Sequence, residues 1–144
     1  MTLIETRHPK LGQLLRLWSA HRKDAALPPA SAFHPASLAE LAPSAVLLMQ
    51  QGEGNGALTI ASSGSEVDAL YGITLTGASA RDLTPVHGDA EAEARSAIET
   101  TRPVLIEDEI QSEGRRRRVA RLYLPLAADD GTPSGVLCGV VAVF

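Results

Sequence analysis

GSEVDALYGITLTGASARDL, residues 64–83, is the most informative segment of the chain. Its short helical pieces are separated by glycines, and it follows two runs, residues 45–50 and 57–62, that have the composition of strands. The loop between these runs contains Asn55 and Gly56, a dipeptide that tolerates the positive φ angles of a hairpin turn. This pattern predicts a hairpin followed by a block of short helices.

The rest of the chain continues in the same style, with single helices and hairpin-linked strands. We expect helices at residues 11–23, 36–41 and 89–101, and further strands at residues 104–110, 117–126 and 135–143. No repeated strand-helix-strand rhythm occurs. The order predicts an α+β domain with an antiparallel sheet.

The side-chain alternation of the strands predicts how the sheet is covered. Residues 136–143 and 45–49 are apolar on both faces, so both of these strands need cover on both sides. In the strand at 117–126, three leucines alternate with Arg121, Tyr123 and Pro125. This strand therefore has one apolar and one mixed side, and we expect it to lie away from the middle of the sheet with Tyr123 outside.

The helix at residues 11–23 is amphipathic. Leu11, Leu14, Leu15 and Trp18 recur at the spacing of one helical face. We expect this face to cover the outer side of the sheet, alone or paired with the same helix of another protomer. Three prolines in the linker at residues 24–35 predict extended or turned backbone there.

Composition limits the classes of function. A chain of 144 residues is the size of one domain, and its net charge of −4 does not suit the basic surface that nucleic acid requires. No apolar run is long enough to cross a bilayer, and the N-terminus lacks a signal-peptide core, so we expect a cytoplasmic protein with no membrane partner. The single Cys138 excludes an internal disulfide.

A family resemblance rests on two groups of residues. They are Gly64, Asp68, Ala69, Leu70, Tyr71, Gly72, Leu75, Thr76 and Gly77, and downstream Leu122, Tyr123, Leu124, Pro125 and Leu126. This pattern resembles the single-domain PAS proteins of the PAS_5 type found in alphaproteobacteria.

The resemblance implies a five-stranded antiparallel sheet in the order 2-1-5-4-3, with helices enclosing a small-ligand cavity on one face and an N-terminal amphipathic helix on the other. Residues 1–35 would form that helix and the proline-rich linker, and residues 36–144 the PAS core. Such proteins sense small molecules or make protein contacts, often as homodimers, and carry no chemistry of their own. We therefore expect a sensor or adaptor in bacterial signal transduction that reaches a signalling kinase or regulator by contact. The alternative is a ligand-free structural module for dimerisation or interaction.

Within that frame, two sets of candidate site residues follow. We expect an unknown small molecule to bind in an apolar cavity lined by Tyr71, Leu75, Leu122, Leu124 and Cys138. The Tyr71 hydroxyl either orients the ligand or bonds a backbone carbonyl as an ordinary core tyrosine. We expect the interface to use Leu11, Leu14, Leu15, Trp18, Leu137 and Val141.

Catalysis, metals and ring cofactors are not expected. The chain has no nucleophile elbow and no phosphate-binding glycine loop, and its histidines form no metal-like spacing with Cys138. A haem-binding PAS domain would need a histidine such as His87. We interpret His87 as an exposed loop residue, because it stands beside Gly88 and Asp89 at the start of a helix. An aromatic content of only 3% also does not suit a pocket for a ring cofactor. A flavin photosensor of the PAS superfamily would need a Gly-x-Asn-Cys motif on a helix, whereas Cys138 lies on a predicted strand.

The densest charge feature is the run Arg115, Arg116, Arg117 and Arg118. Guanidinium groups bind phosphate and carboxylate, so this run is a candidate site for a phosphorylated ligand or an acidic partner. The alternative is a solvated hairpin whose charges protect a sheet edge.

Overall fold

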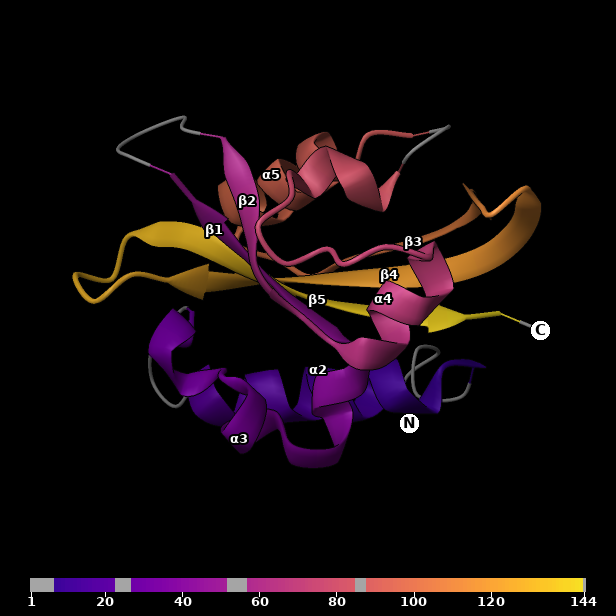
Figure 1. Cartoon of the computed structure of the whole chain (residues 1–144). Helices are drawn as coiled ribbons and strands as arrows, with labels where there is room; N and C mark the ends of the chain where they lie inside the picture. The colour runs from indigo at the N-terminus through magenta and orange to yellow at the C-terminus, as the bar shows by residue number, and fades with distance from the viewer. Residues whose placement is uncertain (1–6, 23–26, 52–56, 85–87, 144) are drawn as a thin grey trace.

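The computed structural model describes residues 7–22, 27–51, 57–84 and 88–143. These residues form one five-stranded antiparallel sheet with helices on both of its faces (Figure 1). The strands are β1 (Ala45–Gln50), β2 (Leu58–Ser63), β3 (Val104–Ser112), β4 (Arg115–Ala127) and β5 (Pro133–Ala142). Their spatial order is β2-β1-β5-β4-β3, so the predicted α+β fold and strand order are confirmed.

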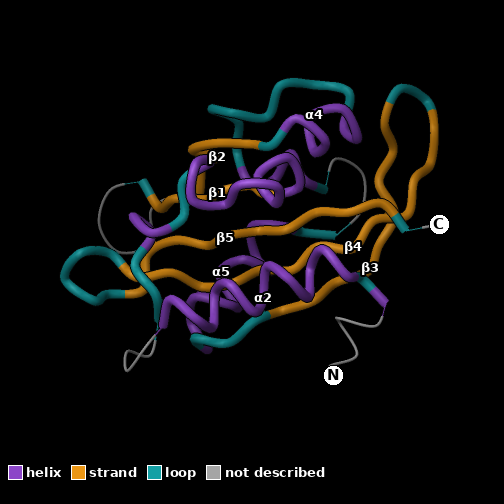
Figure 2. The backbone as a smooth tube through the Cα atoms, turned by 90° about the horizontal axis from the view of Figure 1, so that it is seen from below, coloured by secondary structure: helices purple, strands orange, loops and turns teal. Residues whose placement is uncertain are grey.

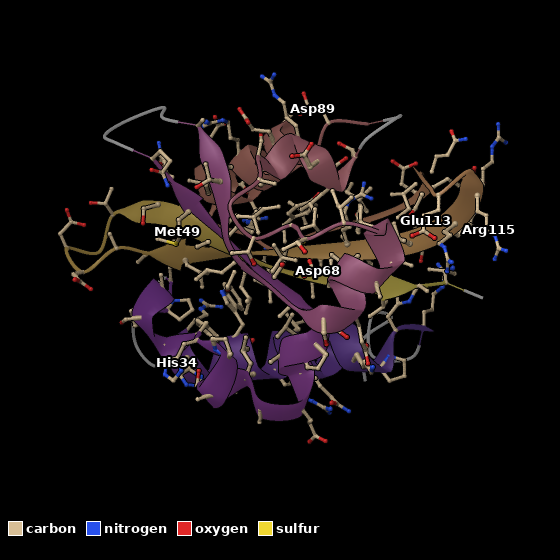
Figure 3. The ribbon with its side chains drawn as sticks, in the orientation of Figure 1. His34, Met49, Asp68, Asp89, Glu113 and Arg115 are labelled. Atoms are coloured by element: carbon tan, nitrogen blue, oxygen red, sulfur yellow. The ribbon has the colours of Figure 1, made fainter. Side chains whose placement is uncertain are left out.

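The β3–β4 hairpin is longer than predicted because its turn is tight. Glu113 and Gly114 both adopt positive φ, at 52° and 76°, which lets the ladder continue from Ser112 directly to Arg115. All four consecutive arginines therefore belong to β4, and all are exposed. Figure 3 shows Arg115 and Glu113 at this end of the molecule, with Arg115 pointing outward.

Three helical pieces cover the inner face of the sheet: α4 (Ser65–Tyr71), the 3₁₀ helix η3 (Ala80–Leu83) and α5 (Ala90–Thr100). Asp68 organises the turn after α4, because one of its carboxylate oxygens accepts from Ser63 Oγ at 2.7 Å and from the Leu75 amide at 3.1 Å. α5 begins at Asp89, whose side chain accepts from the Ala92 amide at 3.0 Å.

α5 presents buried alanines to the sheet. The inner cluster, as we call the core on this face, consists of Val46, Leu48, Leu58, Ile60, Val67, Tyr71, Leu75, Ala80, Leu83, Ala90, Ala94, Ala97, Ile110, Val119, Tyr123, Val136, Cys138 and Val140.

The outer face is covered by α2 (Pro9–Arg22), α3 (Pro35–Leu38) and the 3₁₀ helices η1 (Ala30–Ala32) and η2 (Ala39–Ser44). Figure 2 shows α2 lying along the middle strands of the sheet. Trp18 Nε1 donates to the carbonyl of Pro125 on β4 at 2.8 Å. The outer cluster consists of Leu11, Leu14, Trp18, Leu27, Phe33, Leu38, Ala45, Ala120, Leu122, Leu124, Leu126, Ala127 and Leu137. The predicted cover of both sheet faces is thus present within one chain.

Two sequence expectations differ from the structure. The helix predicted at residues 36–41 is divided, because Ala39 has a positive φ of 52° and a 3₁₀ helix that includes Pro43 follows it. β4 lies between β5 and β3, and it is buried on both faces from Val119 to its end. The expectation of a half-exposed strand with Tyr123 outside is therefore wrong.

The N-terminal helix and linker share the outer cluster with the sheet. A boundary at residue 35 stays a prediction. Among the described helices, none has both the length and the apolar character that crossing a membrane requires.

Candidate functional site

A buried arginine lies on the inner face of the sheet. Arg121 is on β4 with 0% of its surface exposed, and its side chain shares the inner side of the strand with Tyr123. Its Nε donates to Tyr123 Oη at 3.0 Å, and its Nη2 lies 3.3 Å from Glu93 Oε1 and 3.4 Å from Asp108 Oδ2. Charge-assisted hydrogen bonds of this kind are what allow a guanidinium to be buried.

The partners of Arg121 come from three elements. Glu93 lies on α5, Asp108 on β3 and Tyr123 on β4. Tyr123 Oη donates to Glu93 Oε1 at 2.6 Å, so one carboxylate oxygen joins the tyrosine and the arginine. We call Arg121, Tyr123, Glu93 and Asp108 the polar cluster. It connects the helix above the sheet to two strands of the sheet.

One part of Arg121 has no partner. A guanidinium carries five N–H donors, of which Nη1 holds two. Within the described residues, Nη1 is buried and makes no hydrogen bond of good geometry, although the Tyr71 hydroxyl lies close enough to the guanidinium to interact with it. Leaving a buried donor unpaired costs about 1–3 kcal/mol.

Tyr71 lies close to this group. Its hydroxyl donates to the carbonyl of Leu83 on η3 at 2.7 Å. Of the two alternatives expected for Tyr71, this is the one in which it bonds a backbone carbonyl as a core tyrosine. Burial raises the pKa of Tyr71, while the nearby positive charge of Arg121 works against that shift. Burial likewise raises the pKa of Tyr123. Both tyrosines therefore stay neutral and can each donate one hydrogen bond.

Cys138 and Leu75 also belong to the inner cluster. Burial raises the pKa of the Cys138 thiol to about 12. At neutral pH the side chain is a thiol rather than a nucleophilic thiolate. In this environment Cys138 is a buried, unreactive side chain.

The predicted ligand set is divided between the two faces. Tyr71, Leu75 and Cys138 lie in the inner cluster, whereas Leu122 and Leu124 lie in the outer cluster. Successive side chains of a strand point to opposite faces, and Tyr123 between these leucines is the residue that faces inward. The prediction that Leu122 and Leu124 line a cavity with Tyr71 is wrong, and the inner face carries the buried charge of Arg121 beside its apolar cluster.

The residues predicted for an interface pack against the chain's own sheet. Leu11, Leu14 and Trp18 are at most 3% exposed, and Leu137 is fully buried. Leu15 and Val141 are partly buried at the margin of the same cluster. The first four side chains are therefore covered without a second protomer, and a homodimer stays a prediction.

Sequence reasoning missed most of the polar cluster. Arg121 and Tyr123 were recognised only as the mixed side of a strand, and Glu93 was not singled out within the helix predicted at residues 89–101. The available signal was the pair of polar residues alternating with leucines inside a long strand. His87 lies outside the described residues, and the described part of the chain holds no group of His, Cys, Asp or Glu side chains suited to a metal ion.

Comparison with solved structures finds light-oxygen-voltage domains. One such domain, studied with a flavin analogue, matches with a TM-score of 0.60 and 13% identity over 79% of this chain and 88% of that one. A fungal light-oxygen-voltage photoreceptor matches with a TM-score of 0.55 and 21% identity over 74% of this chain and 78% of that one. The light state of the Aureochrome1 domain gives 0.54 and 14%, covering 71% and 82%. At these identities the likeness shows the fold alone.

No curated protein matches this sequence. The family model of the PAS domain matches residues 6–141. Because this match spans nearly the whole chain, the protein belongs to the PAS domain family, whose fold is typical of sensor domains rather than enzymes.

Proposed function

We propose that this chain is a PAS-type sensor or adaptor in bacterial signal transduction. A small molecule binds on the inner face of the sheet, and the change is passed on by protein contact, either between two copies of the chain or with a signalling kinase or regulator. The observation that carries the proposal is Arg121 Nη1, a fully buried donor without a partner among the described residues. A guest acceptor at this atom removes the cost of the unpaired donor.

The arrangement of β4 supports a route for the signal. Arg121 and Tyr123 face the helices on the inner side, and Leu122 and Leu124 face α2 on the outer side. The carbonyl of Pro125 on the same strand accepts from Trp18 of α2. A shift of β4 that follows ligand binding therefore changes the packing of α2, which is a population shift between two packings of one sheet.

We propose that no flavin is bound, because these residues lack the flavin photosensor motif. The only cysteine, Cys138, lies on β5 with its pKa raised to about 12, whereas the flavin photosensor motif places a reactive cysteine on a helix. The polar cluster also takes up part of the inner face, between α5 and strands β3 and β4. We propose a small, non-aromatic guest with at least one hydrogen-bond acceptor, and neither haem nor flavin.

A ligand-free interaction module is the second candidate. The contacts within the polar cluster favour it. Glu93, Asp108 and Tyr123 already accept three of the five N–H donors of Arg121, so these three donors need no bound molecule. In that case the polar cluster acts only to hold α5 in register on the sheet.

Mass spectrometry of the purified, natively folded protein separates the two. The sensor predicts a bound small molecule that is released on unfolding and is depleted in Arg121→Lys, which keeps the positive charge but lacks the Nη1 donors. A high-resolution crystal structure in which Arg121 Nη1 is bonded to water or to protein alone, together with no detectable bound molecule, would favour the interaction module instead.

A further inference from the structure

The end of β5 borders a hollow that neither cluster fills. It has a volume of about 530 Å³ and is lined by Arg7 and Lys10 at the start of α2, by Glu66 and Leu70 of α4, and by residues 140–143. In Figure 1 the start of α2 lies below the yellow end of β5 and α4 lies above it. We call this hollow the edge pocket, because it lies between the two helical layers at the side of the sheet.

On the side of β5 that faces away from β4, the backbone along this pocket has no strand partner within the described residues. β1 pairs with β5 only as far as Gly139, opposite Ala45, whereas β4 continues to Ala142, opposite Val119. The Val143 amide donates to the carbonyl of Arg118 on β4 at 2.9 Å. Because backbone groups alternate along a strand, those of Ala142 and Val140 point away from β4 and into the pocket. Within the described ranges no strand pairs with them on that side.

We propose that the edge pocket docks an extended segment of a partner protein, which adds a strand to the free edge of β5. Unpaired amides and carbonyls at a sheet edge form a template for an added strand. The side chains of such a strand alternate between the two sides of the sheet. Alternate residues of the partner segment therefore face α2 and α4 in turn.

The two sides of the pocket differ in chemistry, which defines the partner. The α2 side carries two permanent cations, Lys10 and the exposed Arg7, which also lies 3.2 Å from Glu107 of β3. The α4 side presents Leu70 beside the carboxylate of Glu66. The complementary segment has acidic residues facing α2 and apolar residues facing α4. An alternation of glutamate or aspartate with valine or leucine satisfies both sides.

An ion pair spans the pocket and can be exchanged. Lys10 Nζ lies 3.1 Å from Glu66 Oε2, joining α2 to α4, with the two side chains 52% and 56% exposed. Ser44 Oγ also donates to this oxygen at 3.0 Å. An ion pair this exposed contributes little to stability. A carboxylate of the partner can therefore replace Glu66 as the neighbour of Lys10.

This inference rests on one part of the proposed function, signalling by protein contact. It does not depend on the other part, the binding of a small molecule at Arg121. Loss of the small-molecule proposal leaves it in place. Failure of the peptide test below removes it alone, because the small molecule is detected separately by mass spectrometry.

The test uses the full chain and a six-residue probe peptide of alternating glutamate and valine, acetylated and amidated. In an amide NMR titration we expect the Val140 and Ala142 signals to shift and their hydrogen exchange to slow. A matched peptide of alternating lysine and valine should bind about tenfold more weakly, because its charges meet Arg7 and Lys10. The glutamate peptide with alternate backbone nitrogens methylated should also lose about tenfold, because it cannot form the ladder.

Variants of the chain locate the site. Glu66→Gln should raise the affinity for the glutamate peptide, and Lys10→Gln should lower it, each by about 2- to 5-fold, as exposed charge pairs allow. Ala142→Pro removes the amide that faces the pocket but no bond to β4, and should abolish ladder formation. Gln13→Ala, an exposed change on α2 outside the pocket lining, should have no effect. The two exposed charge variants keep the test decisive if the proline variant does not fold.

Three results would overturn the proposal. The first is no detectable binding at about 1 mM peptide. The second is a set of amide shifts centred on Arg115 to Arg118 instead of the end of β5. The third is equal affinity for the glutamate peptide and its backbone-methylated form. Protection of Val140 and Ala142 that grows with protein concentration, without any peptide, would replace the partner segment by a second copy of this chain.

Discussion

At the residue scale, the polar cluster shows how one misjudged side chain changes the interpretation of a strand. Tyr123 and Arg121 carry polar groups, and periodicity alone assigns them to one face without saying whether that face is buried. The deciding partner is Glu93, 30 residues earlier in the chain, whose carboxylate accepts from both. Tertiary pairing over such a distance leaves no local signal in the sequence.

The first prediction concerns Tyr123→Phe. The change removes the 2.6 Å bond to Glu93 and the 3.0 Å bond from Arg121 Nε, leaving a buried donor and acceptor short of a partner. We expect the free energy of unfolding in urea to fall by about 1–3 kcal/mol. Arg117→Gln, an exposed change on the same strand, should alter it by less than about 0.5 kcal/mol. Equal stability of Tyr123→Phe and the wild type would mean that the polar cluster contributes nothing to folding.

The second prediction concerns the glycine that opens the segment at residues 64–83. A Cβ on Gly64 would collide with the backbone carbonyls of Ala42 and Pro43, which belong to η2 and cannot move without displacing it. On Gly139 it would come within 2.7 Å of Leu11 and Leu14, but only of their side-chain ends. We therefore expect Gly64→Ala to cost more than about 3 kcal/mol and Gly139→Ala about 1–2 kcal/mol, measured by thermal or urea unfolding. The reverse order of cost would show that η2 yields more readily than α2.

At the element scale, the sequence predicts the elements that local patterns determine. The two strands with apolar residues on both faces, β1 and β5, are adjacent, and the Leu11–Trp18 stripe packs on the outer side of β5 and β4, whereas η2 lies against β1. The hairpin turn at Gly114 was predictable from its glycine. What could not be predicted was the burial of β4, because it depends on α5 and β3 supplying Glu93 and Asp108.

In the candidate site too, local patterns predicted some features, and tertiary contacts decided the others. Tyr71, Leu75 and Cys138 were placed on the correct face because their elements were correctly assigned. Leu122 and Leu124 were misplaced because the apolar side of β4 was taken to be its cavity side. The apolar side faces α2, and the polar side faces inward around Arg121. In this domain the inner face of β4 is the more polar one.

The third prediction concerns how the start of α2 is tied to β3. Glu107 Oε1 lies 2.7 Å from His8 Nε2, and Glu107 Oε2 accepts from Arg7 at 3.2 Å. The hydrogen bond with His8 holds the pKa of Glu107 below its ordinary value of 4.5. A lowered pKa gives stability that is present above the ordinary value and is lost as the pH falls through the folded-state value. We expect Glu107→Gln to flatten the loss of stability as the pH is lowered below about 4.5.

The measurement is the urea midpoint of the wild type and of Glu107→Gln across acid pH. The two curves should differ most near neutral pH and converge in acid. Glu113→Gln, an exposed change in the β3–β4 turn, serves as the control. Curves that stay parallel through the acid range would contradict a role for Glu107 in holding α2.

At the scale of the whole molecule, the sheet is a layer shared by two cores. The inner cluster and the outer cluster lie on opposite faces of the same strands, and β4 contributes to both. Both helices are held by groups of that strand: the Tyr123 side chain bonds Glu93 of α5, and the backbone carbonyl of Pro125 accepts from Trp18 of α2. The central claim is that a change at the polar cluster alters the packing of α2 on the sheet, and that β4 transmits this change.

The chain contains one tryptophan, so the Trp18 indole N–H gives a single, assignable NMR signal on the outer face. Its chemical shift and hydrogen exchange, measured in the wild type, in Tyr123→Phe and in the control Ile60→Val on β2 of the inner cluster, test the claim directly. The account predicts that Tyr123→Phe shifts this signal and speeds its exchange, while Ile60→Val leaves both unchanged. An indole signal that is identical in all three proteins would contradict it.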